Sequence, residues 1–279
     1  MLSGTWNYPL PLEFLDAISK LYGPSLQGLY WNDYPSTIFG KTTSASLEFL
    51  GSFSSLFVLD LCNYRGETIP KSSPAILPSV RNLITSNTQR SMAAATALRL
   101  PSLHNLTLKA HPEGAPTELL ISFLEAHGAS LVSIDLPSPF TESDTEPDAS
   151  QFRRTATHIN PDIFLQNKLC PNLASFTFPV TSPSMSADIN HPLRRIGLRS
   201  VRAESLYPDK PTTTRGHLMS FTPDRYPNLE VIRTVGFLVD ADTDALIKDV
   251  FIWWAEKFEK QGVDFLDGEG VLWEYTDSL

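Results

Sequence analysis

A short apolar pattern recurs along most of this 279-residue chain. Each copy has an apolar residue, two variable residues, a second apolar residue, one variable residue and a third apolar residue. A repeated segment of this kind cannot bury its own apolar side, so it has to stack against neighbouring copies. Six copies are clear: Leu26, Leu29, Trp31; Leu56, Leu59, Leu61; Leu103, Leu106, Leu108; Leu131, Ile134, Leu136; Leu173, Phe176, Phe178; and Leu193, Ile196, Leu198. Two weaker copies carry Thr in the last position: Val80, Leu83, Thr85 and Leu229, Ile232, Thr234.

Turn-forming residues precede nearly every copy. Pairs such as Pro24-Ser25, Pro101-Ser102 and Pro171-Asn172 stand just before the first apolar residue. Proline at this place stops a preceding helix and leads into extended chain. Helical spacing comes before two of the turns, and we expect the glycine that follows each to adopt a left-handed helix end. These segments are Leu12, Leu15, Ile18, Leu21 before Gly23, and Leu119, Leu120, Phe123, Leu124 before Gly128.

The order of helix, turn and short strand predicts an α/β fold. Side chains alternate along a strand, so the first, second and third apolar residues of each copy are expected to enter one core. The copies begin 20 to 42 residues apart, and four of the seven intervals lie in the 20–29 range of leucine-rich repeats. Residues 1–239 are therefore predicted to form a curved leucine-rich-repeat solenoid of about eight irregular units, with helices and irregular segments on its convex side.

The last forty residues have a different character. They hold eleven acidic and three basic residues, which accounts for nearly all of the net charge of −9. Asp242 or Thr243 is expected to cap a helix that runs to about Gln261. Its apolar residues Leu246, Val250, Trp253, Trp254 and Phe258 lie near one stripe. Residues 240–279 are thus predicted to be a C-terminal helical cap and an acidic tail that close the end of the repeats.

Composition excludes several classes of protein. The net negative charge argues against a general nucleic-acid binder, which needs a basic surface. No apolar run reaches the roughly 18 residues of a membrane span, and no secretion signal begins the chain. The two cysteines, Cys62 and Cys170, cannot form a disulfide framework. We expect an intracellular protein, cytoplasmic or nuclear, with no nucleic-acid or membrane partner.

Catalytic and cofactor-binding motifs are missing from the sequence. It contains no phosphate-binding loop, no dinucleotide-binding glycine pattern and no metalloprotease or nucleophile-elbow motif. The six histidines show no metal-ligand spacing. We therefore expect no enzyme activity, no catalytic residue, no cofactor and no metal. Cys62 is predicted to face outward from a strand, which leaves a reactive thiol open as an alternative.

Three segments carry a resemblance to a known family: Leu169-Cys170-Pro171-Asn172-Leu173, Leu100-Pro101-Ser102-Leu103 and Tyr226-Pro227-Asn228-Leu229. With the strand pattern that follows each, residues 10–239 resemble the leucine-rich-repeat half of F-box proteins, especially the divergent fungal kind. The resemblance implies a substrate receptor of an SCF-type ubiquitin ligase. In that family an N-terminal F-box docks on the adaptor subunit.

An F-box is not evident in the chain. Leu10-Pro11-Leu12-Glu13-Phe14-Leu15 is similar to the start of one, but the first repeat strand begins at Leu26 and leaves no room for three helices. We interpret the segment as the helix of the first repeat with Pro near its start. Two hypotheses therefore remain: a ligase substrate receptor whose F-box lies upstream, and a standalone interaction scaffold without a ligase role.

The outward strand positions are the predicted binding site for a protein partner on the concave face. Arg195, Arg199 and Arg233 are expected to form one basic patch that engages an acidic segment of the partner. Residues 137–168 form a long insertion and a second candidate contact. The outward positions are Tyr30, Asp60, Asn82, Asn105, Thr107, Lys109, Ser133, Asp135, Ser175, Thr177, Arg195, Arg199 and Arg233.

Overall fold

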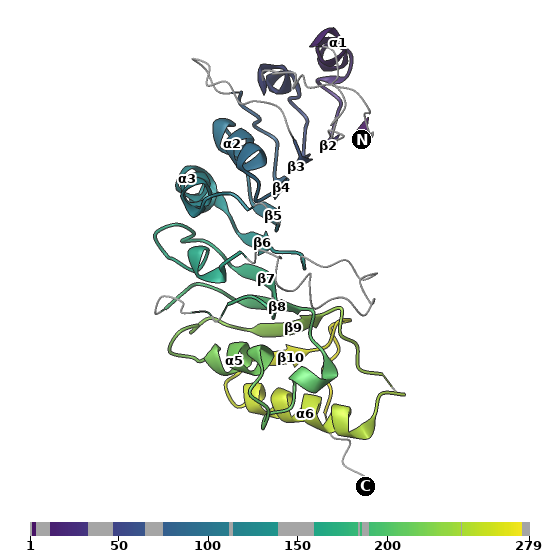
Figure 1. The fold of residues 1–279 in the computed structure, drawn as a ribbon, viewed down its shortest axis with the longest axis vertical. Helices are drawn as coiled ribbons and strands as arrows, with labels where there is room; N and C mark the ends of the chain where they lie inside the picture. Colours follow the sequence, from purple (N-terminus) through teal and green to yellow (C-terminus); the bar gives the residue numbers. More distant parts are fainter. Residues whose placement is uncertain are drawn as a thin grey trace. The chain divides into compact units, whose positions relative to one another are not determined.

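The chain folds into two compact units, each built of parallel strands and helices (Figure 1). The computed structural model describes residues 2–3, 12–32, 47–64, 75–111, 114–138, 159–183, 185, 190–240 and 242–274. Within these ranges the first unit ends at Leu131 and the second begins at Val132. The α/β fold predicted from the sequence is thus confirmed in both units.

The first unit holds strands β1 to β5, and every neighbouring pair of these strands is parallel. Helix α2 packs against β3 and β4, and it also contacts α3. Figure 1 shows α2 and α3 on the same side of the strands. The elements are β1 (Leu2–Ser3), α1 (Leu12–Tyr22), β2 (Gly28–Asn32), η1 (Leu47–Ser52), β3 (Val58–Asn63), β4 (Asn82–Ser86), α2 (Gln89–Ala97), β5 (Asn105–Lys109), α3 (Thr117–His127) and η2 (Gly128–Ser130).

The second unit holds strands β6 to β10, which are also parallel to their neighbours. Helix α6 packs against β10, the last strand (Figure 1). The elements are β6 (Ser133–Asp135), η3 (Pro161–Ile163), β7 (Ser175–Pro179), β8 (Arg195–Arg199), η4 (Ala203–Ser205), α5 (Thr213–Ser220), β9 (Val231–Val235), α6 (Ala245–Glu259) and β10 (Asp264–Leu266).

The middle apolar residue of each repeated copy lies opposite its equivalent on the next strand. In the first unit the register aligns Leu29, Leu59, Leu83 and Leu106, and all four are at most 5% exposed. In the second unit the corresponding row is Ile134, Phe176, Ile196, Ile232 and Phe265, each at most 1% exposed. The predicted common interior beneath adjacent parallel strands is therefore confirmed within each unit.

Serine in the turn before a strand joins one repeat to the next. The hydroxyl of Ser55 donates to the carbonyl of Pro24, and that of Ser79 donates to the carbonyl of Ser54, 2.6 Å away. Each bond connects equivalent turns of successive repeats, about one repeat length apart in the sequence. The small residue that recurs before the apolar pattern thus satisfies a backbone acceptor that the turn leaves free.

The two glycine turns differ from the left-handed helix ends expected for them. Gly128 has φ −62° and begins η2, and Gly23 is not among the glycines with positive φ. A Cβ at Gly23 would lie 2.4 Å from the Ser19 carbonyl oxygen and 2.5 Å from that of Ser52. Close packing of backbone against backbone, rather than φ, is therefore what requires glycine at this turn.

The C-terminal helix forms as predicted, with two differences. Its N-cap is Asp244, whose carboxylate accepts from the Leu246 amide, rather than Asp242 or Thr243. Only part of the expected apolar stripe is buried, because Leu246 and Trp253 are 55% and 41% exposed. Trp254 is fully buried, and its indole N–H donates to the Leu206 carbonyl. This hydrogen bond anchors α6 to the segment after η4.

Part of the predicted acidic tail adds one more strand and a tight turn. After Gly262, which has φ +74°, β10 pairs with β9, and the chain then reverses so that Leu272 bridges Leu266 in the antiparallel sense. The buried Asp267 carboxylate accepts from the amides of Glu269 and Val271 and from the Trp273 indole. Burial alone would raise the pKa of Asp267, but these hydrogen bonds outweigh it and lower the pKa.

The two threonines in the repeated pattern yield a first prediction. Thr85 and Thr234 are both fully buried at the third apolar position. Among the described residues the Thr85 hydroxyl has no hydrogen-bond partner, whereas the Thr234 hydroxyl donates to the Phe237 and Leu266 carbonyls. Since an unpaired buried hydroxyl is costly, Thr85→Val should raise the free energy of unfolding by about 1 kcal/mol.

Denaturant unfolding of both valine variants measures this difference. Thr234→Val serves as the matched control, because it removes hydrogen bonds and should leave stability unchanged or reduced. Equal effects of the two substitutions would show that the Thr85 hydroxyl is not an unpaired group.

Candidate protein-binding face

Each unit presents one sheet face that carries the outward strand positions, which we call the open face of that unit. All thirteen residues predicted for the binding site are partly or largely exposed. Their placement follows from strand alternation, since the residues between them form the buried rows described above.

The open face of the first unit consists of short rows across neighbouring strands. The register places Asn82 beside Asn105, and Tyr30 beside Asp60. The Asn105 side-chain amide donates to the Asn82 side-chain oxygen at 2.8 Å. Lys109 lies opposite Ser86 at the end of β5. These side chains come from different repeats, and the parallel register brings them together.

Two apolar residues belong to this face that were not among the predicted site residues. Ile84 lies between Asp60 and Thr107 in the same row, and Val58 lies beside Asn82. Both are partly exposed. They occupy the same positions of the repeat as the polar residues of this face. Strand alternation therefore predicts that they face outward too, if apolar residues are counted among the outward positions. The face is therefore polar with an apolar centre, which suits a protein partner.

The register gives the open face of the second unit three rows. The first contains Ser133, Ser175, Arg195, Val231 and Asp264; the second contains Asp135, Thr177, Gly197, Arg233 and Leu266; and a third, across β7 to β9, contains Pro179, Arg199 and Val235. The Thr177 side chain covers Gly197, since a Cβ there would lie 2.4 Å from the Thr177 hydroxyl. Glycine at this position therefore makes room for the threonine on the neighbouring strand.

Arg199 and Asp135 form a two-pronged ion pair on this face. Arg199 Nε lies 3.1 Å from Asp135 Oδ1, and a terminal nitrogen of its guanidinium lies 3.0 Å from Oδ2. The pair links β8 to β6 across β7, and about a third of each side chain is exposed. Its parallel geometry is the strong form of an arginine–carboxylate contact. The positive charge of Arg199 is thus compensated within the protein.

The three arginines of the predicted basic patch share the second unit's open face but differ in their contacts. Arg233 lies opposite Gly197, between Arg195 and Arg199 of the neighbouring strand. Its guanidinium donates to the Gly268 carbonyl, which holds the side chain without neutralising it. Arg195 is exposed, and the nearby Glu230 carboxylate is already bound by Arg194. Positive charge on this face therefore comes mainly from Arg195 and Arg233.

The reactive-thiol alternative for Cys62 is disfavoured by its surroundings. Burial raises the pKa of the thiol to about 12, and the carboxylate of Asp60 adds to the rise while Lys109 opposes it. A thiol with this pKa is protonated at neutral pH and is a weak nucleophile. Cys170 is buried in a helix-to-strand turn, and burial likewise raises its pKa to about 12.

Among the described residues, no group of three or more His, Cys, Asp or Glu side chains could hold a metal ion. No helix in those same ranges has both the length and the apolar character needed to cross a membrane. The predicted insertion at 137–168 lies largely outside the described ranges, since 139–158 are not described. Comparison of the chain with protein-family models, with curated proteins and with solved structures finds no match.

The Arg199–Asp135 pair leads to a second prediction. Arg199→Gln and Asp135→Asn should each lower the free energy of unfolding by about 1 kcal/mol, and the double variant should lose clearly less than the sum. Urea unfolding of the four proteins gives the coupling energy. The more exposed Arg194–Glu230 pair provides the control and should show a smaller coupling. Additive losses at Arg199 and Asp135 would refute the stabilising pair.

Cys62 gives a third prediction. In a Cys170→Ser background, iodoacetamide should alkylate Cys62 slowly at pH 8, and the rate should rise about tenfold per pH unit while the thiol stays mostly protonated. Asp60→Asn removes a negative charge that raises the thiol pKa, so it should increase the rate at pH 8. Mass spectrometry measures the rate. A rate that levels off near pH 8 would contradict the raised pKa.

Proposed function

We propose that the chain is a protein-recognition module of the leucine-rich-repeat type, which binds its partner with the open faces of its parallel strands. One observation carries the proposal: outward side chains from successive repeats lie in register, exposed, in rows across neighbouring strands. A row of this kind can contact an extended surface at many points. Polar side chains with an apolar centre and arginines are typical of such interfaces.

Charge on the second unit's open face indicates the chemistry of the partner. Arg195 and Arg233 carry positive charge that no carboxylate in the described ranges binds directly, while Arg199 is paired with Asp135. An acidic segment of a protein partner is the complementary surface, and opposite charges raise both specificity and association rate. Within the predicted patch, Arg195 and Arg233 are therefore the residues that make contact.

Within this module class, the substrate-recognition part of an SCF-type ubiquitin-ligase receptor is our first candidate. It is supported by the resemblance of the turn-and-strand segments around Leu173, Leu103 and Leu229 to F-box proteins of the leucine-rich-repeat kind. The second candidate is a standalone scaffold, which the same open faces would serve. Copurification of the longest product of the transcript with the ligase adaptor subunit distinguishes them, since only the receptor should retain the adaptor.

A fourth prediction tests the binding faces. A photo-crosslinking amino acid at Asn105, on the first unit's open face, should capture a partner in cell extract, and one at Glu125 on α3 should not. The captured partner should then bind the Arg195→Glu/Arg233→Glu variant at least tenfold more weakly, as expected when two charged contacts are reversed. Binding of the purified partner is measured by interferometry.

Arg202→Glu is the matched control, because Arg202 is exposed in the second unit but lies outside the strands. It should leave affinity within about twofold. Circular dichroism of each variant checks that the fold is retained. Capture from Glu125 as efficient as from Asn105, or unchanged affinity of the double variant, would contradict the proposed faces.

A further inference from the structure

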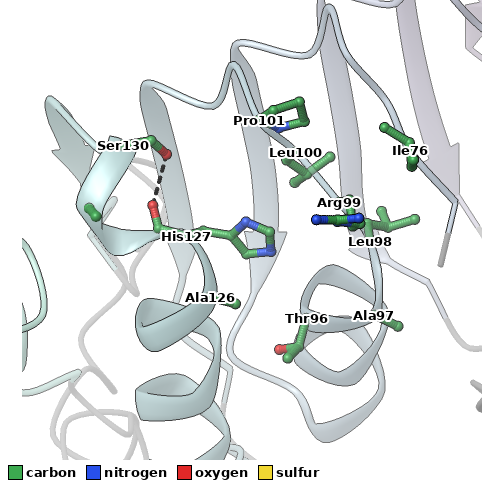
Figure 2. Close-up of a pocket in the computed structure, with 11 residues that line it drawn as sticks. Ile76, Thr96, Ala97, Leu98, Arg99, Leu100, Pro101, Ala126, His127 and Ser130 are labelled. Carbon is green, nitrogen blue, oxygen red and sulfur yellow. Dashed lines mark hydrogen bonds between the residues drawn. The ribbon is translucent and has the colours of Figure 1, made fainter.

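A pocket of about 680 Å³ opens in the first unit between the ends of α2 and α3 (Figure 2). Its volume lies within the range of about 300–1,000 Å³ that is usual for small-molecule sites. The pocket has no part in the proposed protein-binding face, because no strand residue lines it. Most of its wall is apolar and consists of Ile76, Ala97, Leu98, Leu100, Pro101 and Ala126.

His127 is the buried polar group of this pocket. Its side chain comes from the last residue of α3, and Figure 2 shows the ring pointing toward the segment with Leu98 and Arg99. The residue is 8% exposed, and Nε2 makes no hydrogen bond of good geometry among the described residues, although the backbone carbonyls of Ala95 and Leu98 lie near the ring. A buried ring nitrogen without a partner costs stability unless something in the pocket binds it.

Arg99 supplies a positive charge to the same pocket. Its backbone is fixed on both sides, because its amide donates to the Ala75 carbonyl and its carbonyl accepts from the Leu77 amide. The guanidinium is exposed, and within the described ranges it makes no hydrogen bond or ion pair. Both side-chain hydroxyls that line the pocket already donate hydrogen bonds within the protein: that of Thr96 to the Met92 backbone carbonyl, and that of Ser130 to the His127 backbone carbonyl.

The helix ends restrict where a charged group can lie. Helices α2 and α3 both end at the pocket, and the carbonyl groups at a helix C-terminus carry partial negative charge. They disfavour an anion in contact with these carbonyls, whereas the Arg99 guanidinium and an N–H at His127 Nε2 favour one within hydrogen-bond reach of their own donors. A ligand with one anionic end and an apolar body satisfies both conditions, since its body can lie against the alanines of the helix ends.

We propose that this pocket binds a small apolar molecule that carries one carboxylate. The carboxylate accepts hydrogen bonds from the Arg99 guanidinium and from His127 Nε2, in the tautomer that protonates this nitrogen. The apolar body packs between the ends of α2 and α3, against Ala97, Ala126 and Leu98. Binding here is independent of the open faces, so it adds a ligand site to the proposed interaction module.

Three octyl compounds with different head groups test the charge selectivity. Octanoate, octanol and octylammonium have the same tail, and saturation-transfer NMR with the full chain measures their dissociation constants. Octanoate should bind roughly three- to tenfold more tightly than octanol, and octylammonium more weakly than both. Arg99→Gln should abolish the preference for octanoate over octanol, and His127→Phe should reduce it. Equal affinity of the three compounds would overturn the proposal.

Two alanine-to-tryptophan variants test the location. Ala126 is exposed on α3 and lines the pocket, so Ala126→Trp should obstruct it and reduce octanoate binding at least tenfold. Ala17 is exposed on α1 and does not line the pocket, so Ala17→Trp should leave binding unchanged. Arg202→Gln is the corresponding control for Arg99→Gln. Binding that survives Ala126→Trp would place the octyl site elsewhere and refute the proposal, whatever the outcome at the open faces.

Discussion

Every other feature of the two units depends on the contact between equivalent inward side chains of adjacent parallel strands. Leu29, Leu59, Leu83 and Leu106 lie in one such row, and none of them could be removed from water by its own short segment. Each strand is buried only because the next repeat covers it, so stability is shared between neighbours. Register is strongly specified for the same reason, since a shift by one residue would turn the leucines toward solvent.

The same register creates the candidate binding surface. Once inward residues are aligned, the residues between them must lie side by side on the opposite face. Contacts across strands then fix their positions, as in the Asn105–Asn82 hydrogen bond and the Arg199–Asp135 ion pair. A side chain held in this way loses less conformational freedom when a partner binds. The surface is therefore a consequence of core packing rather than a separate feature.

Much of this arrangement could be predicted because it depends on periodicity. The eight apolar patterns predicted the buried rows, including the two patterns that end in Thr85 and Thr234. All residues predicted to face outward are at least partly exposed. The conformation of the glycine turns was predicted wrongly. Gly23 is required by the Ser52 carbonyl of another segment, and no local sequence rule reports a contact with a distant residue. Leu246 and Trp253 are exposed because the buried side of α6 is rotated away from the predicted stripe and includes Phe251 and Ala255 instead.

Which arginines of the candidate patch are paired with a carboxylate could likewise not be predicted from the sequence. Arg199 counted as a free cation until the structure placed Asp135 beside it, from a strand 64 residues earlier. The pocket with Arg99 and His127 was not predicted either, because its walls come from the ends of two helices.

The sequence by itself determined which side chains are buried and which face outward, because alternation along a strand is a local property of the backbone. Only the tertiary structure decided which outward charges are paired and where a cavity opens. Those outcomes depend on distances between residues far apart in the chain, and only the packing of the repeats sets such distances.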